Sequence, residues 1–218
     1  MTTARPLSPT RTTAPFSGVV LVGGRSTRMG RDKARLDWKG LPLWQRQIGV
    51  LARAGCTPVR LALRRHQRSF GDPAREVRDA RPDVGPLGGL HAALVASAGS
   101  EWVAVLAVDL PLIEPAWFRK LRRLCRPGSG AVVQTSDGFE PLAAIYPIAA
   151  LPVVARRLEA GEFALQGLLA ELVRRGLMLA VSPGRGQVGQ VENWNEPGDV
   201  RRSAGSTRTR RRGRGRQA

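Results

Sequence analysis

The sequence predicts an α/β protein with a mostly parallel β-sheet in one domain. Two short apolar runs, residues 19–22 and 102–108, are rich in Val, which is typical of strands covered on both faces of a parallel sheet. Amphipathic helical segments alternate with runs of this kind, without an internal repeat or a linker in residues 18–200. A chain of 218 residues can form one sizeable α/β domain or two small ones, and the unbroken alternation favours one.

The first predicted strand, residues 19–22, runs directly into Gly23 and Gly24. Paired glycines remove two β-carbons where the backbone turns, so a ligand can approach the main chain closely. The cations that follow suit the oxygens of a polyphosphate. The alternative is an ordinary glycine turn with solvent-facing arginines, because the spacing matches neither G-x-x-x-x-G-K-[ST] nor G-x-G-x-x-G. The cations are Arg25, Arg28, Arg31 and Lys33.

Residues 43–52 place apolar side chains on one face of a predicted helix, and residues 59–63 form the next predicted strand. The polar segment 64–67 follows at the carboxyl end of that strand, where open α/β sheets bind ligands. His66 in this segment either contacts a ligand or is simply solvated.

A short strand over residues 76–79 ends in Asp79, and a glycine-rich turn over residues 85–89 then enters a helix. The unpaired N–H groups at a helix N-terminus suit an anion. The alternative is a tight turn whose glycines permit close helix packing.

The clearest buried strand, residues 102–108, runs into Asp109. A carboxylate at the tip of a central strand needs a cation, and Mg²⁺ bridging to phosphate oxygens is the usual partner. The alternative is an Asp that caps the helix starting near Glu114. The position at the strand tip favours the metal.

The remaining segments continue the alternation of strands and helices. Helices are predicted over residues 116–126, 151–159 and 162–174, and strands over residues 131–133, 142–146 and 177–181.

Composition predicts a soluble protein. Apolar residues make up 42% of the chain, and no run approaches the roughly 20 apolar residues that a membrane helix needs. The two cysteines lack the spacing of a disulfide framework or a zinc site, which favours a reducing compartment and the cytoplasm.

The formal charge of +18 is concentrated in the tails. Residues 201–218 hold eight arginines and residues 1–11 hold two, without an acid in either segment. Removing these ten from the 35 basic residues leaves 25 against 17 acidic residues, a net charge of +8. We expect residues 1–17 and 201–218 to be disordered. Nucleic-acid binding is then limited to non-specific contact by the arginine-rich tail.

The motif L-V-G-G-R-S-T-R-M-G-R-D-K-A, residues 21–34, resembles the signature L-x-G-G-x-S-x-R-M-G-x-D-K-A of molybdenum cofactor guanylyltransferases. The resemblance extends over residues 18–200 and includes G-P-L-x-G at 85–89 and D-x-P at 109–111. It implies a Rossmann-like, three-layer α/β/α nucleotidyltransferase domain. The implied reaction transfers GMP from GTP to molybdenum-molybdopterin and releases pyrophosphate.

The resemblance also implies roles for individual residues. Lys33 and Arg28 act on the phosphates, and Asp109 carries Mg²⁺, so these three are the expected catalytic residues. Asp79 matches an aspartate that contacts the nucleotide. Implied partners are GTP, molybdenum-molybdopterin, and proteins that deliver molybdopterin or mature molybdoenzymes. The guanine and ribose end is expected to lie on Leu21, Val22, Gly23 and Gly24, of which Gly24 favours GTP over CTP.

Three positions depart from the family pattern. Ala62 stands where some relatives have an Asn, residues 163–165 are apolar where basic residues are common, and Glu196 replaces a Thr. The last two lie in the half expected to receive molybdopterin. Two alternatives stay open: a relative that uses CTP or a sugar phosphate, and a non-catalytic protein that binds nucleic acid through its tail.

Overall fold

An eight-stranded sheet forms the middle layer of the computed structural model, which describes residues 16–23, 32–79, 81 and 83–183. The strand order is β10-β7-β9-β6-β1-β4-β5, with β8 paired to β7. Pairing is parallel except that β9 runs antiparallel to β6 and β7, and β8 antiparallel to β7. The strands are β1 (Phe16–Leu21), β4 (Val59–Leu63), β5 (Glu76–Arg78), β6 (Trp102–Ala107), β7 (Gly130–Thr135), β8 (Gly138–Phe139), β9 (Ala143–Pro147) and β10 (Met178–Val181).

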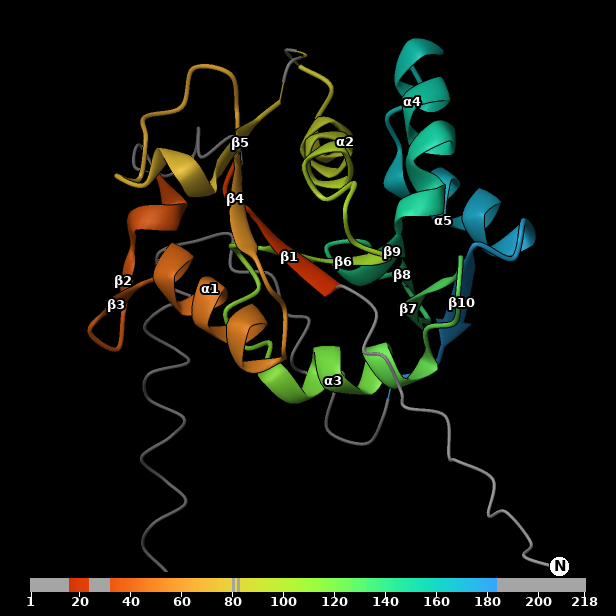
Figure 1. The fold of residues 1–218 in the computed structure, drawn as a ribbon, viewed down its shortest axis with the longest axis horizontal. Helices are drawn as coiled ribbons and strands as arrows, with labels where there is room; N and C mark the ends of the chain where they lie inside the picture. The colour runs from red at the N-terminus through yellow and green to blue at the C-terminus, as the bar shows by residue number, and fades with distance from the viewer. Residues whose placement is uncertain (1–15, 24–31, 80, 82, 184–218) are drawn as a thin grey trace, which may run out of the picture.

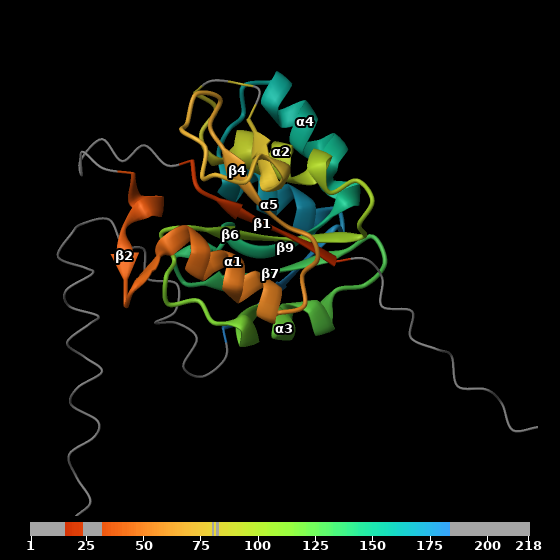
Figure 2. The ribbon, with the colours of Figure 1, turned by 60° about the vertical axis from the view of Figure 1, so that its left-hand side comes forward.

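Helices cover both faces of this sheet and complete three layers (Figure 1). One hydrophobic core lies between the sheet, α1 and α3, and a second lies between the sheet, α2, α4 and α5. Figure 2 shows the same layers after a turn of the molecule. The three-layer α/β/α fold predicted from the sequence is therefore confirmed. The helices are α1 (Leu43–Arg53), α2 (Pro86–Ala96), α3 (Pro115–Leu124), α4 (Leu151–Glu159) and α5 (Leu165–Arg174).

Strand β1 lies next to β6, the middle strand of the sheet, and the direction of chain winding reverses between these two strands. The chain passes from β1 outward to β4 and β5, and then returns to place β6 on the other side of β1. Val19 and Val105 are paired across these two central strands and are both fully buried. Open α/β sheets bind ligands beyond the carboxyl ends of the strands at such a reversal.

Short elements connect the layers. A two-stranded hairpin of β2 (Asp37–Trp38) and β3 (Leu41–Pro42) lies outside the main sheet, and the sequence patterns did not indicate it. Three 3-10 helices are η1 (Lys33–Arg35), η2 (Pro73–Arg75) and η3 (Ile148–Ala150). Within the described ranges, no helix has both the length and the apolar character that crossing a bilayer requires.

Most predicted boundaries match the structure or shift by one or two residues, and two shift by three. Strand β1 begins at Phe16, so Phe16 and Ser17 belong to the sheet and not to a disordered segment 1–17. The Ser17 hydroxyl donates to the Trp102 carbonyl at 3.4 Å, and Phe16 packs in a core. Helix α5 begins at Leu165 instead of Glu162, because the Glu162 N–H closes the end of α4 on the Arg157 carbonyl at 2.9 Å and Ala164 is extended, with a ψ of 115°. The expected domain end at residue 200 and the arginine-rich tail lie outside the described residues.

Candidate functional site

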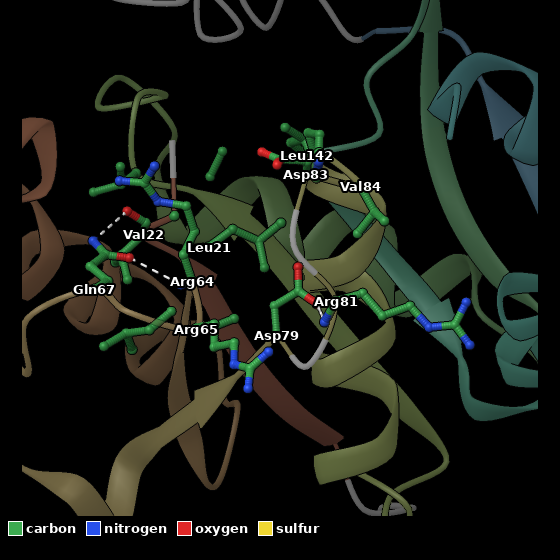
Figure 3. A pocket seen from close by; sticks show the side chains of 18 of the residues that line it. Leu21, Val22, Arg64, Arg65, Gln67, Asp79, Arg81, Asp83, Val84 and Leu142 are labelled. Atoms are coloured by element: carbon green, nitrogen blue, oxygen red, sulfur yellow. Dashed lines mark hydrogen bonds between the residues drawn. The ribbon is translucent and has the colours of Figure 1, made fainter. Parts of the chain in front are cut away.

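A pocket of about 910 Å³ lies over the carboxyl ends of β5, β4, β1 and β6 (Figure 3). Six of the site residues expected from the sequence line it, whereas Gly24 and Arg28 lie outside the described residues. The pocket also takes side chains from the segment after β4 and from the turn before α2. The six expected residues are Leu21, Val22, Gly23, Lys33, Asp79 and Asp109.

Asp109 follows β6 and faces the pocket near Lys33. Burial raises the pKa of the Asp109 carboxyl, and the positive charge of Lys33 opposes that rise. The turn that carries Asp109 is tied to β1, since the Val108 N–H donates to the Leu21 carbonyl at 3.1 Å. A partly buried carboxylate of this kind is stabilised by a cation.

Glu140 is a second acid close to Asp109, and the sequence analysis missed it. The ladder between β6 and β9 continues past Leu106 and Ala143, since the Ala107 N–H donates to the Leu142 carbonyl at 2.8 Å. This pairing brings the segment before β9 to the tip of β6. Burial first, and then the negative charge of Asp109, raises the pKa of Glu140 to about 7.

The donor set around Asp109 fits Mg²⁺ bound together with a substrate. Among the described residues, no three His, Cys, Asp or Glu side chains gather into a metal-binding group. Mg²⁺ usually keeps several waters and is held by one or two carboxylates plus substrate phosphates instead of an all-protein cage. Asp109, with Glu140 nearby, offers hard oxygen ligands of this type.

Asp79 follows β5 at the other end of the pocket. Its backbone N–H donates to the Leu63 carbonyl at 2.9 Å, and its carboxylate accepts from the Arg81 N–H at 2.9 Å (Figure 3). Burial raises the pKa of Asp79, and the Arg81 N–H, then the charges of His91 and Arg81, oppose that rise.

Asp79 and Asp109 have separate roles because of where their strands lie. Three strand spacings separate β5 from β6, about 14 Å at about 4.8 Å each. Two carboxylates that far apart cannot ligate one metal ion. Asp109 is therefore the acid suited to a metal, and Asp79 the one suited to a more distant part of a ligand.

The glycines before and within α2 make room for Asp79. A β-carbon on Gly88 would overlap the Asp79 carboxylate and would lie 2.6 Å from Val84 Cγ2. Gly85 has a φ of 63°, which lies in the left-handed region that favours glycine. The sequence left open whether this turn serves a ligand or close helix packing. The glycines permit close packing, and the group packed against them is Asp79, an acid that lines the pocket.

Gln67, which the sequence placed in the polar segment at the ligand-binding edge without a role of its own, connects three parts of the site. Its side-chain amide donates to the Val22 carbonyl at 3.0 Å and to Asp32 Oδ2 at 3.1 Å. Its Oε1 accepts from the Arg64 N–H at 3.2 Å, as the dashed lines in Figure 3 show. Asp32 in turn caps η1, accepting from the Ala34 N–H at 3.1 Å. Gln67 therefore fixes the residue before Lys33 against the end of β1.

The wall of the pocket at the end of β4 combines the apolar Ala62 with polar residues that follow the strand. Ala62 is 3% exposed and lines the pocket without offering a hydrogen bond from its side chain. Arg64, Arg65 and His66 line the same wall and could supply polar contacts. No single motif marks these residues; the signal in the sequence is a polar run directly after a buried strand.

The doubly wound sheet brings a lysine and an aspartate into one pocket at the edge where winding reverses, an arrangement suited to an α/β protein that binds a metal-bound nucleotide. The profile of the MobA-like NTP transferase domain family matches residues 18–175. The chain belongs to this family.

Named relatives agree with this membership. The chain is 52% identical over 186 residues to the "Probable molybdenum cofactor guanylyltransferase" of Opitutus terrae, covering 84% of this chain and 92% of the relative. It is 37% identical over 188 residues to the "Molybdenum cofactor guanylyltransferase" of Pseudomonas putida, covering 84% and 94%.

A solved structure supports the fold. The chain resembles "Molybdopterin-guanine dinucleotide biosynthesis protein A" from Archaeoglobus fulgidus with a TM-score of 0.66 and 21% identity, covering 88% of this chain and 98% of that chain.

Proposed function

We propose that this chain transfers the GMP moiety of GTP to molybdenum-molybdopterin, forming molybdopterin guanine dinucleotide and pyrophosphate. The observation that carries the proposal is the meeting of Lys33 and Asp109 in one pocket at the reversal of strand order. The relatives named above, which match almost over their full length, support the choice of guanylyl transfer.

In this reaction a terminal phosphate oxygen of molybdopterin attacks the α-phosphorus of GTP. A new P–O bond forms as the bond to pyrophosphate breaks, and the electron pair of that bond leaves with pyrophosphate. Because the nucleophile is already an anion, no general base is needed. The protein's task is to align two anions and to neutralise the charge that grows between them.

The residues of the pocket divide this task. Lys33 presents a cation to the phosphates, and Asp109, with Glu140 nearby, would hold Mg²⁺. Mg²⁺ supplies charge neutralisation at the phosphate oxygens when it is bound. Arg28, expected from the motif, would add a second cation from the segment outside the described residues.

The far end of the pocket is assigned to the nucleoside. The Asp79 carboxylate lies there, about 14 Å from Asp109 by three strand spacings, and the backbone of residues 21–23, at the end of β1 beside β6, lines the pocket between the two acids. Gly24 supports GTP over CTP by the family pattern. The alternatives are a relative that uses CTP or one that uses a sugar phosphate as the acceptor.

The wider setting follows from the same proposal. The acceptor would arrive from a molybdopterin-delivering protein, and the product would pass to proteins that mature molybdoenzymes. We place the reaction in the cytoplasm, and we limit nucleic-acid contact to non-specific binding by residues 201–218.

The test measures pyrophosphate release from GTP or CTP with molybdenum-molybdopterin as acceptor. Wild-type protein should release pyrophosphate with GTP and not with CTP, and Asp109→Asn or Lys33→Ala should abolish release while the proteins stay folded. Asp72→Asn, an exposed aspartate outside the pocket, is the matched control and should keep full activity. Undiminished turnover in either site variant would overturn the assigned roles.

A further inference from the structure

Gln47 is a buried polar side chain on α1 that contacts the Asp109 turn and does not line the pocket. Its residue exposure is 0%, and it lies among apolar neighbours on the buried face of the helix. Its Nε2 donates to the Ala107 carbonyl at 3.3 Å and to the Leu110 carbonyl at 2.8 Å. Both partners lie at least 60 residues further along the chain.

These two carbonyls are the two ends of the turn that carries Asp109. The turn runs from residue 107 to residue 110, and the Leu110 N–H closes it on the Ala107 carbonyl at 3.4 Å. One amide group therefore holds both ends of the turn with its two hydrogens. The Asp109 carboxylate projects from the segment between those ends and lines the pocket.

The chemistry of Gln47 indicates that its donors are what this position needs. Burying a polar group is unfavourable unless it is hydrogen-bonded, and an apolar side chain would suit the core side of an amphipathic helix. Gln47 uses both N–H donors, whereas its Oε1 is buried without a hydrogen-bond partner in the described structure. An amide therefore occupies this buried position although its acceptor oxygen is unused.

The neighbouring residue on α1 extends the same attachment. Arg46 Nε donates to the Pro111 carbonyl at 2.8 Å, and its guanidinium pairs with Glu114 at 3.1 Å. Two successive residues of one helix therefore hold the segment on both sides of Asp109. Of these two, Gln47 contacts the turn itself.

We propose that Gln47 is a positioning residue that fixes the orientation of the Asp109 carboxylate toward a metal-bound nucleoside triphosphate. This inference rests on the proposed function, in which Asp109 holds the divalent ion. Without the two hydrogen bonds the turn samples more conformations, so the Asp109 carboxylate is no longer held in the orientation that binds the ion. The site then loses affinity for the metal more than for the nucleotide.

The test compares Gln47→Met, which keeps the approximate shape and removes both donors, with Val50→Ala on the same helix. Val50 is fully buried in the same core, and its side chain cannot form a hydrogen bond with the Asp109 turn. Its truncation therefore controls for general loss of stability. Mn²⁺ binding by electron paramagnetic resonance serves as the metal readout, with whichever of GTP and CTP the wild type binds. Metal-free nucleotide affinity is measured by calorimetry.

We expect Gln47→Met to weaken Mn²⁺ binding at least tenfold while nucleotide affinity without metal changes less than twofold. Val50→Ala should leave both affinities unchanged. Three results would each overturn the inference. They are wild-type-like Mn²⁺ affinity in folded Gln47→Met, equal losses of Mn²⁺ affinity in the two variants, and a wild type that binds no Mn²⁺ with either nucleotide. If Gln47→Met does not fold, Gln47→Glu, which can donate at most one of the two hydrogen bonds, should show the same selective loss.

The outcome separates this inference from the proposed function. A wrong assignment of GTP or of the acceptor appears in the wild type, as a preference for CTP or as absent transfer. A wrong role for Gln47 appears in the difference in Mn²⁺ affinity between variant and wild type, or in a wild type that binds no Mn²⁺ with either nucleotide.

Discussion

Glu140 links the stability of the fold to pH, and the size of the effect follows from its surroundings. Burial and the nearby Asp109 raise the pKa of this carboxyl from 4.5 to about 7 in the folded protein. The folded state therefore keeps a proton between pH 4.5 and about 7 that the unfolded chain loses, so stability falls as pH rises through this window. At about 1.4 kcal/mol for each tenfold change in proton affinity, the loss is about 3 kcal/mol.

The perturbation that isolates this effect is Glu140→Gln, which keeps the shape and removes the titration. Free energies of unfolding by urea are measured from pH 4 to pH 8 without divalent ions for both proteins. Asp79, whose pKa burial also raises, titrates in both proteins and cancels in the difference, whereas Asp109 is coupled to Glu140 and its titration belongs to the pair that the difference measures. Wild type should lose about 3 kcal/mol more than Glu140→Gln across the window.

A surface control and a clear contrary result complete the design. Glu159→Gln replaces an exposed glutamate at the end of α4, and its stability profile should run parallel to that of wild type. If the Glu140→Gln profile is also parallel to wild type, the carboxyl does not hold a proton to neutral pH and the reasoning fails.

Two further substitutions test the supports of the pocket. Gly88→Ala places a β-carbon against the Asp79 carboxylate, so it should destabilise the fold by about 1–3 kcal/mol and weaken nucleotide binding. Gly99→Ala, whose β-carbon would meet nothing within 4 Å, should be near neutral in the same urea and calorimetry measurements; equal effects at the two glycines would contradict this account. Gln67→Met removes the hydrogen bonds to Val22 and Asp32, so it should weaken GTP binding about tenfold, the equivalent of about 1.4 kcal/mol. Unchanged affinity by calorimetry would show that this network does not shape the site.

Local patterns in the sequence were enough to predict most of the elements. Strand β4 and helix α4 have the bounds that the apolar patterns predicted, Val59–Leu63 and Leu151–Glu159. The direction of β9 could not be predicted, because an apolar run such as Ala143–Pro147 is compatible with either a parallel or an antiparallel strand. Its antiparallel pairing depends on the β6 and β7 partners that the fold supplies.

For the site too, local patterns predicted some residues, whereas residues whose roles depend on distant partners could not be predicted. Asp79 and Asp109 could be predicted because each lies at or just past the carboxyl end of a predicted strand, and the carboxyl ends of parallel strands meet at one edge. Gln47, Gln67 and Glu140 could not, since their roles depend on backbone groups or side chains distant in the chain. A residue that bonds a carbonyl 63 positions away leaves no local pattern.

The two acids of the pocket are supported from opposite faces of the sheet. Asp109 is held through Gln47 on α1, which packs in one core, whereas Asp79 rests against Gly88 of α2, which packs in the other. Any small slide of one helical layer relative to the other would therefore alter the gap between the two carboxylates. Buried substitutions in either helical layer, far from the ligand, could in this way change the length of substrate that the enzyme prefers.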